Sequence, residues 1–108
     1  MRVNILGTDY EIVKQTSEEN PKLKNANGLC EMYAHKIVLE DYDHTGLTMY
    51  DNLEAYDKKV LRHEIVHAFF AESGLRSSCN YAECEELVDW IAIQFPKMLK
   101  VFQEVDAL

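Results

Sequence analysis

Hydrophobic and polar residues alternate along the first part of the chain, which is the pattern of half-buried strands. Apolar side chains from Val3 to Ile12 lie on either side of the turn-forming residues 7–9. Two alternating segments joined by such a turn predict a β-hairpin. Residues 16–28 are polar and contain the breakers Asn-Pro and Asn-Gly, so they predict a loop with at most a short helical turn.

A second pair of strands is expected between Cys30 and Leu39. Residues 37–39 are the β-prone Ile-Val-Leu, and residues 34–36 can turn the chain between the two halves. Turn-forming residues follow up to Asp51, and either Thr48 or Asp51 can cap the helix that begins there.

The second half of the chain reads as helical. Residues 52–73 contain no Gly or Pro and become apolar almost all round, so this helix should be buried on several sides and should end at Gly74. After a loop to about Tyr81, a second helix is expected over residues 82–95. Pro96 should interrupt it or restart it as a last amphipathic helix that ends near Val105. Strands followed by helices predict an α+β fold.

Length and composition predict one compact domain over residues 1–108, with 47% hydrophobic and 28% charged residues. The apolar runs are far shorter than the roughly 20 residues that cross a bilayer, and a signal sequence is not seen, so we expect a cytoplasmic protein without a membrane partner. The three cysteines are expected to be free thiols. A net charge of −8 argues against nucleic-acid binding.

The strongest chemical signal is the sequence HEIVH at residues 63–67, an HExxH motif inside the longest predicted helix. Two histidines four residues apart differ by about 40° around a helix, so His63 and His67 can both reach one tetrahedral Zn²⁺ ion. Glu64 can then accept a proton from zinc-bound water as a general base. The alternative is two solvated histidines on a surface helix. It is disfavoured because the neighbouring residues are apolar, and because imidazoles that are buried without a partner are costly.

A catalytic zinc site needs a third protein ligand, and here it should be acidic. No histidine follows His67, and Glu72 lies about 140° away around the same helix. Glu85 and Asp89 are four residues apart on the next helix, so Glu85 can bind the metal while Asp89 holds a ligand histidine through its second nitrogen. Glu86 is the alternative metal ligand. Some of these acids could instead form a solvated first turn that complements the helix dipole.

These motifs resemble a known family. HEIVH followed, after seventeen residues, by ExxxD at residues 85–89 is similar to the gluzincin pattern. Residues 85–96, EELVDWIAIQFP, resemble the ExxAxxFA segment and following proline of the ImmA/IrrE-type metallopeptidases of phages and mobile elements. Val88 and Ile91 depart from the usual small and aromatic residues, and the resemblance covers residues 61–96, about a third of the chain.

Position by position, the resemblance implies that His63, His67 and Glu85 bind zinc. It also implies that Glu64 is the catalytic base and that Asp89 is the partner of a ligand histidine.

The resemblance further implies a fold and an activity. The fold is a small twisted antiparallel sheet packed on the HExxH helix, with an edge strand, for which residues 29–39 are the candidate, that binds a peptide in extended form. The activity is hydrolysis of a peptide bond in a cytosolic protein partner, such as a phage regulator or repressor. The alternative is a non-catalytic protein-binding module on the same scaffold, but the intact Glu64 weighs against it because a structural zinc site has no use for that carboxylate.

A residue that could stabilise the transition state is not assigned. The available side chains are Tyr33, Tyr81, His35 and His44.

Overall fold

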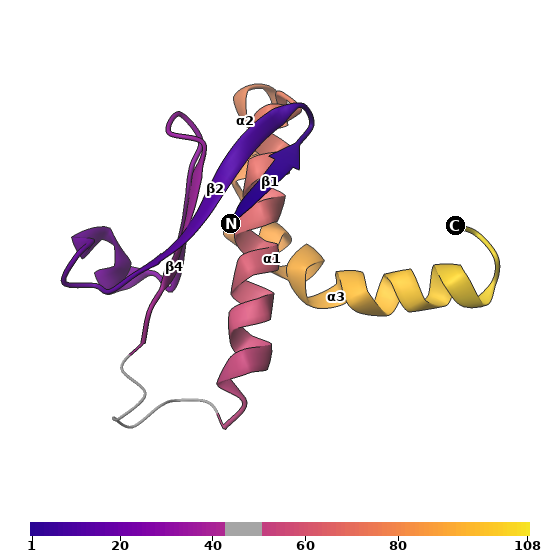
Figure 1. The fold of residues 1–108 in the computed structure, drawn as a ribbon. Helices are drawn as coiled ribbons and strands as arrows, with labels where there is room; N and C mark the ends of the chain where they lie inside the picture. The colour runs from indigo at the N-terminus through magenta and orange to yellow at the C-terminus, as the bar shows by residue number, and fades with distance from the viewer. Residues whose placement is uncertain (43–50) are drawn as a thin grey trace.

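The computed structural model describes residues 1–42 and 51–108 and has the expected α+β fold, with strands first and helices after (Figure 1). The strands are β1 (Arg2–Ile5), β2 (Thr8–Gln15), β3 (Gly28–Glu31) and β4 (Lys36–Glu40). The α-helices are α1 (Leu53–Glu72), the short α2 (Leu75–Ser78) and α3 (Glu85–Glu104). Two 3-10 helices, η1 (Pro21–Asn25) and η2 (Asn80–Glu83), lie in the connections.

The four strands form one mixed sheet in the order β1-β2-β4-β3. Both hairpins are antiparallel as predicted, but β2 and β4 run parallel, so the sheet is not purely antiparallel. The chain leaves β2, forms the outer strand β3 and returns as β4 in the middle, which places β4 in the same direction as β2. Residues 28–31 are therefore at an edge of the sheet, whereas residues 37–39 of the expected edge strand lie inside it.

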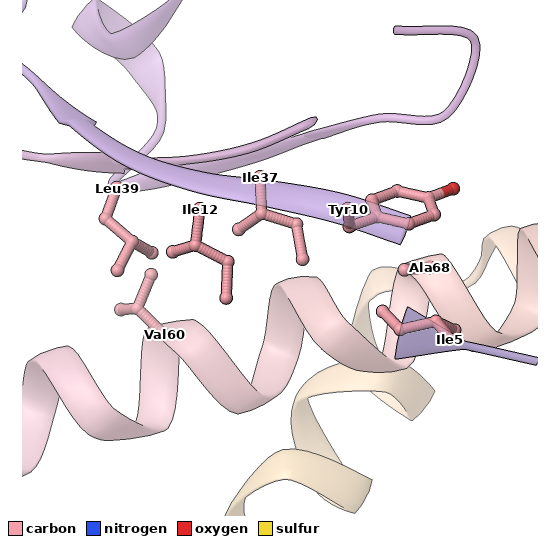
Figure 2. Packing of buried hydrophobic residues seen from close by; sticks show 7 residues of the cluster. All are labelled: Ile5, Tyr10, Ile12, Ile37, Leu39, Val60 and Ala68. Atoms are coloured by element: carbon pink, nitrogen blue, oxygen red, sulfur yellow. The ribbon is translucent and has the colours of Figure 1, made fainter. Parts of the chain in front are cut away.

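One face of the sheet packs on α1 and forms the hydrophobic core (Figure 2). Alternate residues share a face of a strand, so Tyr10 and Ile12 of β2 lie beside Ile37 and Leu39 of β4 on this face. Ile5 of β1 completes the sheet side of the core. From α1 come Val60 and Ala68, two turns apart, with the HExxH residues between them.

The ends of α1 are defined by local hydrogen bonds. Asn52 is the N-cap, because its side chain accepts a hydrogen bond from the backbone N–H of Ala55, and the expectation that Asp51 caps the helix is wrong. Asp51 is one residue too early for that contact, and Thr48 lies outside the described residues. At the other end Gly74 has a φ of 83°, the left-handed conformation predicted for it.

Helix α3 begins at Glu85, three residues later than expected, and continues through Pro96 to Glu104 without a break. The prediction that Pro96 ends or restarts a helix is therefore wrong. A proline inside a helix leaves the carbonyl four residues earlier without its usual donor. Here that carbonyl belongs to Ala92, and it accepts a hydrogen bond of 2.6 Å from Nε of Arg62 on α1.

The expected loop before α3 contains the short helical segments α2 and η2. Among the described residues, no helix combines the length and the apolar character that a membrane span requires.

Candidate metal centre

Two helices bring His63, His67 and Glu85 together. The histidines lie on successive turns of α1, with ring centroids 4.9 Å apart. Glu85 is the first residue of α3, and its carboxylate lies between the two rings. One carboxylate oxygen is 2.8 Å from Nε2 of His63, and the other is 3.0 Å from Nε2 of His67.

The geometry of these three side chains is suitable for a metal ion. One ligand atom from each residue lies within 4.8 Å of the other two. In a tetrahedral zinc site with bonds of about 2.1 Å, the ligand atoms are roughly 3.4 Å apart, so small side-chain rotations are sufficient. The histidine side chains are 15% exposed, whereas that of Glu85 is 69% exposed, so the group is open to solvent on the Glu85 side. These residues could hold a metal ion with a position left for water or substrate.

Asp89 and Lys59 fix the orientation of His63. Oδ1 of Asp89, one turn after Glu85 on α3, accepts a hydrogen bond of 3.0 Å from Nδ1 of His63. The same oxygen accepts another of 3.0 Å from Nζ of Lys59. Partial burial raises the pKa of Asp89, but the hydrogen bonds and charges of Lys59 and His63 outweigh it and lower the pKa below its usual value. A charged Asp89 therefore holds Nδ1 of His63 and leaves Nε2 facing Glu85.

Glu64 is the one buried charged side chain of the described residues, with 5% of its surface exposed. Burial raises the pKa of Glu64 to about 7, with Glu85 raising it and His63 lowering it. Its Oε1 is 3.9 Å from Nε2 of His63, so the carboxyl group lies at the edge of the candidate ligand set. Burial also lowers the pKa of His67 and keeps its imidazole neutral, which is the form that binds metals.

A pocket of about 590 Å³ opens on this group. Its walls come from η1, β3, α1 and the connection to α3, and they include Gly28, Cys30, Glu64, His67, Arg76 and Glu85. Strand β3 approaches α1 very closely. A Cβ atom at Gly28 would lie 2.8 Å from Cγ1 of Val60 and 3.1 Å from Cγ of Glu64. The edge of the sheet is therefore in direct contact with the helical turn that carries Glu64.

Glu72 and Glu86 do not belong to this group of candidate ligands. Glu72 accepts hydrogen bonds from the hydroxyl groups of Thr8 and Tyr10, both 3.2 Å, which agrees with its exclusion as a ligand. Glu86 is exposed and is not part of the candidate ligand set. Asp89, by contrast, makes the expected contact with a histidine.

Of the four side chains left unassigned, Tyr33, Tyr81 and His35 are not among the residues that line this pocket. Tyr33 and Tyr81 are 93% and 56% exposed. His35 lies 4.0 Å from Glu72, beside the hairpin formed by β1 and β2. His44 lies outside the described residues.

Three residues near this group were not predicted from the sequence: Lys59, Arg76 and Cys30. Lys59 precedes His63 by four residues, and this spacing on one helix face was a usable signal. Arg76 of α2 brings a positive charge to the pocket wall, and its Nε is 3.6 Å from Glu83. Cys30 lies in the edge strand, where burial raises its pKa to about 12 and keeps the thiol protonated. No sequence spacing connects Arg76 or Cys30 to the HExxH motif.

Comparison with known proteins gives no relative from which a function could be transferred. No protein-family model, no curated protein and no solved structure matches the chain. The interpretation of the site therefore depends on its own geometry.

Proposed function

We propose that this protein is a zinc-dependent metallopeptidase, with His63, His67 and Glu85 as metal ligands and Glu64 as the general base. The observation that carries the proposal is the convergence of three ligand atoms within 4.8 Å, next to a buried glutamate. Two imidazoles and one carboxylate are a common ligand set of catalytic zinc sites. An HExxH glutamate beside such a set has a role in hydrolysis and none in a purely structural site.

In the proposed reaction, Glu64 and Asp89 have separate roles. Zinc at this site would supply a Lewis acid and would lower the pKa of a coordinated water to about 7. Glu64 accepts a proton from the attacking water and can return it to the amine that leaves. Asp89 keeps His63 in the orientation that ligation needs. The open side of the ligand set, next to Glu85, gives access to the peptide bond.

Strand β3 is the proposed support for the substrate. It pairs with β4 along one side, and within the described residues no strand pairs with its other side. A peptide in extended form can add to such an edge through backbone hydrogen bonds. The pocket that β3 borders contains Glu64 and His67, so a peptide bound there would pass the catalytic group. The resemblance to ImmA/IrrE-type enzymes suggests a cytoplasmic regulator, such as a phage repressor, as the substrate class.

Metal content is the first test of this proposal. We expect about one zinc per chain in the wild-type protein after zinc exposure and dialysis, measured by elemental analysis. Glu85→Ala should lose most of it, because two imidazoles alone bind zinc weakly. Glu86→Ala is the matched control, since it removes a neighbouring carboxylate of the same helix, and it should keep the metal. A wild-type protein without zinc would reject the proposal.

Cleavage of a peptide library, followed by mass spectrometry, then tests the activity. Glu64→Gln should keep the zinc and lose at least about 100-fold in cleavage rate, because the amide cannot accept the proton. Equal cleavage by Glu64→Gln would exclude Glu64 as the base. If the wild type binds zinc and partner but cleaves nothing, the non-catalytic binding module becomes the better interpretation.

A further inference from the structure

The backbone of β3 alternates between groups that face β4 and groups that face the free edge of the sheet. In an antiparallel pair, opposite residues alternate between those that exchange hydrogen bonds and those that do not. The N–H of Glu40 donates to the carbonyl of Asn27 at 3.0 Å, directly before the paired residues of β3. Leu29 therefore also bonds to β4, whereas the N–H and C=O groups of Gly28 and Cys30 point away from β4.

The pairing of β4 with β2 gives the same result independently. The N–H of Glu11 donates to the carbonyl of His35 at 3.0 Å, and the N–H of Asp41 donates to that of Gln15 at 2.8 Å. Odd-numbered residues of β4 therefore bond to β2, and even-numbered residues bond to β3. In the register of β3 with β4, the even-numbered residues are opposite Leu29 and not opposite its two neighbours.

The outward-facing groups of Gly28 and Cys30 lie next to the candidate metal centre. A Cβ atom at Gly28 would be 3.1 Å from Cγ of Glu64, and Cys30 packs against the hydrophobic core. Gly28, Glu64 and Glu85 border both the pocket of about 590 Å³ and a second pocket of about 200 Å³, which also contains His63. A strand added to β3 would lie about 4.8 Å further out, beside both pockets.

The start of this edge is held in place by side-chain hydrogen bonds. Oδ1 of Asn27 accepts a hydrogen bond of 2.8 Å from the hydroxyl group of Tyr56, which lies two turns before His63 on α1. Nδ2 of Asn27 donates to Oε2 of Glu40, the last residue of β4, at 3.2 Å. The backbone groups of the edge are therefore positioned before a peptide arrives, which lowers the cost of ordering them on binding.

We propose that Gly28 and Cys30 bind the backbone of an extended peptide and that Leu29 takes no part in this contact. In either direction, the peptide supplies N–H donors from two residues that are two positions apart. The residue between them donates nothing to β3, so proline is accepted there and excluded at the two donor positions. The substrate class is an extended segment, such as a linker or a loop, and not a helix. This inference rests on the proposed function and adds the register of the substrate.

Amide hydrogen exchange, measured by NMR on the zinc-exposed Glu64→Gln protein, tests this register. In the free protein, Gly28 and Cys30 should exchange at least about tenfold faster than Leu29. The probe is a short peptide selected from a random library for binding to the same protein. Its addition should slow exchange at Gly28 and Cys30 by at least about tenfold and leave Leu29 unchanged. A library without a binder, or a bound peptide that leaves Gly28 and Cys30 unprotected, would overturn the inference.

Methylation of single backbone nitrogens in the selected peptide tests the alternation from the substrate side. Two positions, two residues apart, should each lose at least about tenfold in affinity, because a hydrogen bond is removed and a methyl group is placed at the edge. The position between them is the matched control and should change the affinity by less than about threefold. Losses at two adjacent positions, or at none, would contradict the alternation.

The outcome does not depend on hydrolysis, because binding is measured in the Glu64→Gln protein. Suppose that the register is observed but the wild type cleaves no peptide. The proposed function would then be wrong, and the inference about β3 would stand. If the wild type instead binds zinc and cleaves the selected peptide, but Gly28 and Cys30 are not protected, the inference alone would be wrong.

Discussion

The orientation of His63 depends on a single oxygen atom. Oδ1 of Asp89 accepts hydrogen bonds from both His63 and Lys59, so it connects the candidate metal ligands to the previous turn of α1. A histidine that donates to a carboxylate is a stronger and better-oriented metal ligand. If zinc binds as proposed, Asp89 affects the metal affinity without being a ligand itself.

Asp89→Ala should weaken zinc binding by about 10- to 100-fold, because His63 loses the partner that orients it. The affinity can be measured by competition with a chromophoric chelator. Asp89→Asn should fall between the wild type and the alanine variant, since its amide oxygen can still accept from His63. Glu86→Ala, on the same helix, serves as the control and should leave the affinity unchanged. An alanine variant with wild-type affinity would mean that Asp89 has no part in orienting the ligand.

At the scale of elements, α3 remains helical through Pro96 because another helix compensates for the missing hydrogen bond. Nε of Arg62 donates to the carbonyl of Ala92, a residue that is 1% exposed. Without that donor, a buried carbonyl would have no partner in the helix. The contact also connects α1 to α3, one turn after Asp89 makes its own connection.

Arg62→Met should lower the free energy of unfolding by about 1–3 kcal/mol, because it leaves the carbonyl of Ala92 without a donor. The same substitution should cost clearly less in a Pro96→Ala background, where the new N–H at position 96 can donate to that carbonyl. Urea denaturation of the four proteins gives the coupling energy between the two positions. Equal costs in both backgrounds would show that Arg62 stabilises the protein in some other way.

Secondary structure was predictable where one local pattern dominated. The hairpins, α1 and the turn at Gly74 follow from alternation, breakers and helix periodicity. The parallel pairing of β2 with β4 was not predictable from such patterns, because it depends on where β3 lies in the sheet. The continuity of α3 was missed for a similar reason. Pro96 is a local signal for a break, whereas the compensating Arg62 comes from another helix.

More of the candidate site than of the sheet topology could be predicted from the sequence, because the residues of the site follow helical spacing. His63, His67, Glu85 and Asp89 were paired by intervals of four residues, and the structure brings them together. Arg76 and Cys30 reach the pocket through the packing of α2 and β3, which no interval in the sequence encodes.

At the scale of the whole molecule, stability at high pH should depend on the contact between the first hairpin and the end of α1. The hydroxyl group of Tyr10 on β2 donates to Glu72, the last residue of α1, at 3.2 Å. Burial, together with the negative charge of Glu72 and the hydrogen bond to it, raises the pKa of Tyr10 from 10.0 to about 12. The folded protein therefore keeps Tyr10 neutral at a pH where the unfolded chain has already lost the proton.

The contribution of Tyr10 should be complete below pH 10 and should decrease by about 1 kcal/mol per pH unit between pH 10 and 12. Tyr10→Phe should reduce the free energy of unfolding by about 0.5–1.5 kcal/mol at neutral pH, because the hydrogen bond to Glu72 is lost. Its stability should then depend less on pH above 10 than that of the wild type. Urea midpoints from pH 8 to 11 measure both effects. Tyr33→Phe, at an exposed position, should retain the wild-type dependence.

The mixed sheet also has a consequence for the order of folding. Each hairpin joins residues that are close in the sequence, so β1 with β2 and β3 with β4 can form early and independently. The parallel pairing of β2 with β4, called the parallel seam here, joins Glu11 to Lys36 and can form only after both hairpins exist. We therefore expect that mutations in this seam, such as Ile12→Val, mainly accelerate unfolding and hardly slow folding. The same seam should then be the first part of the sheet to open, which would detach the proposed substrate strand together with β4.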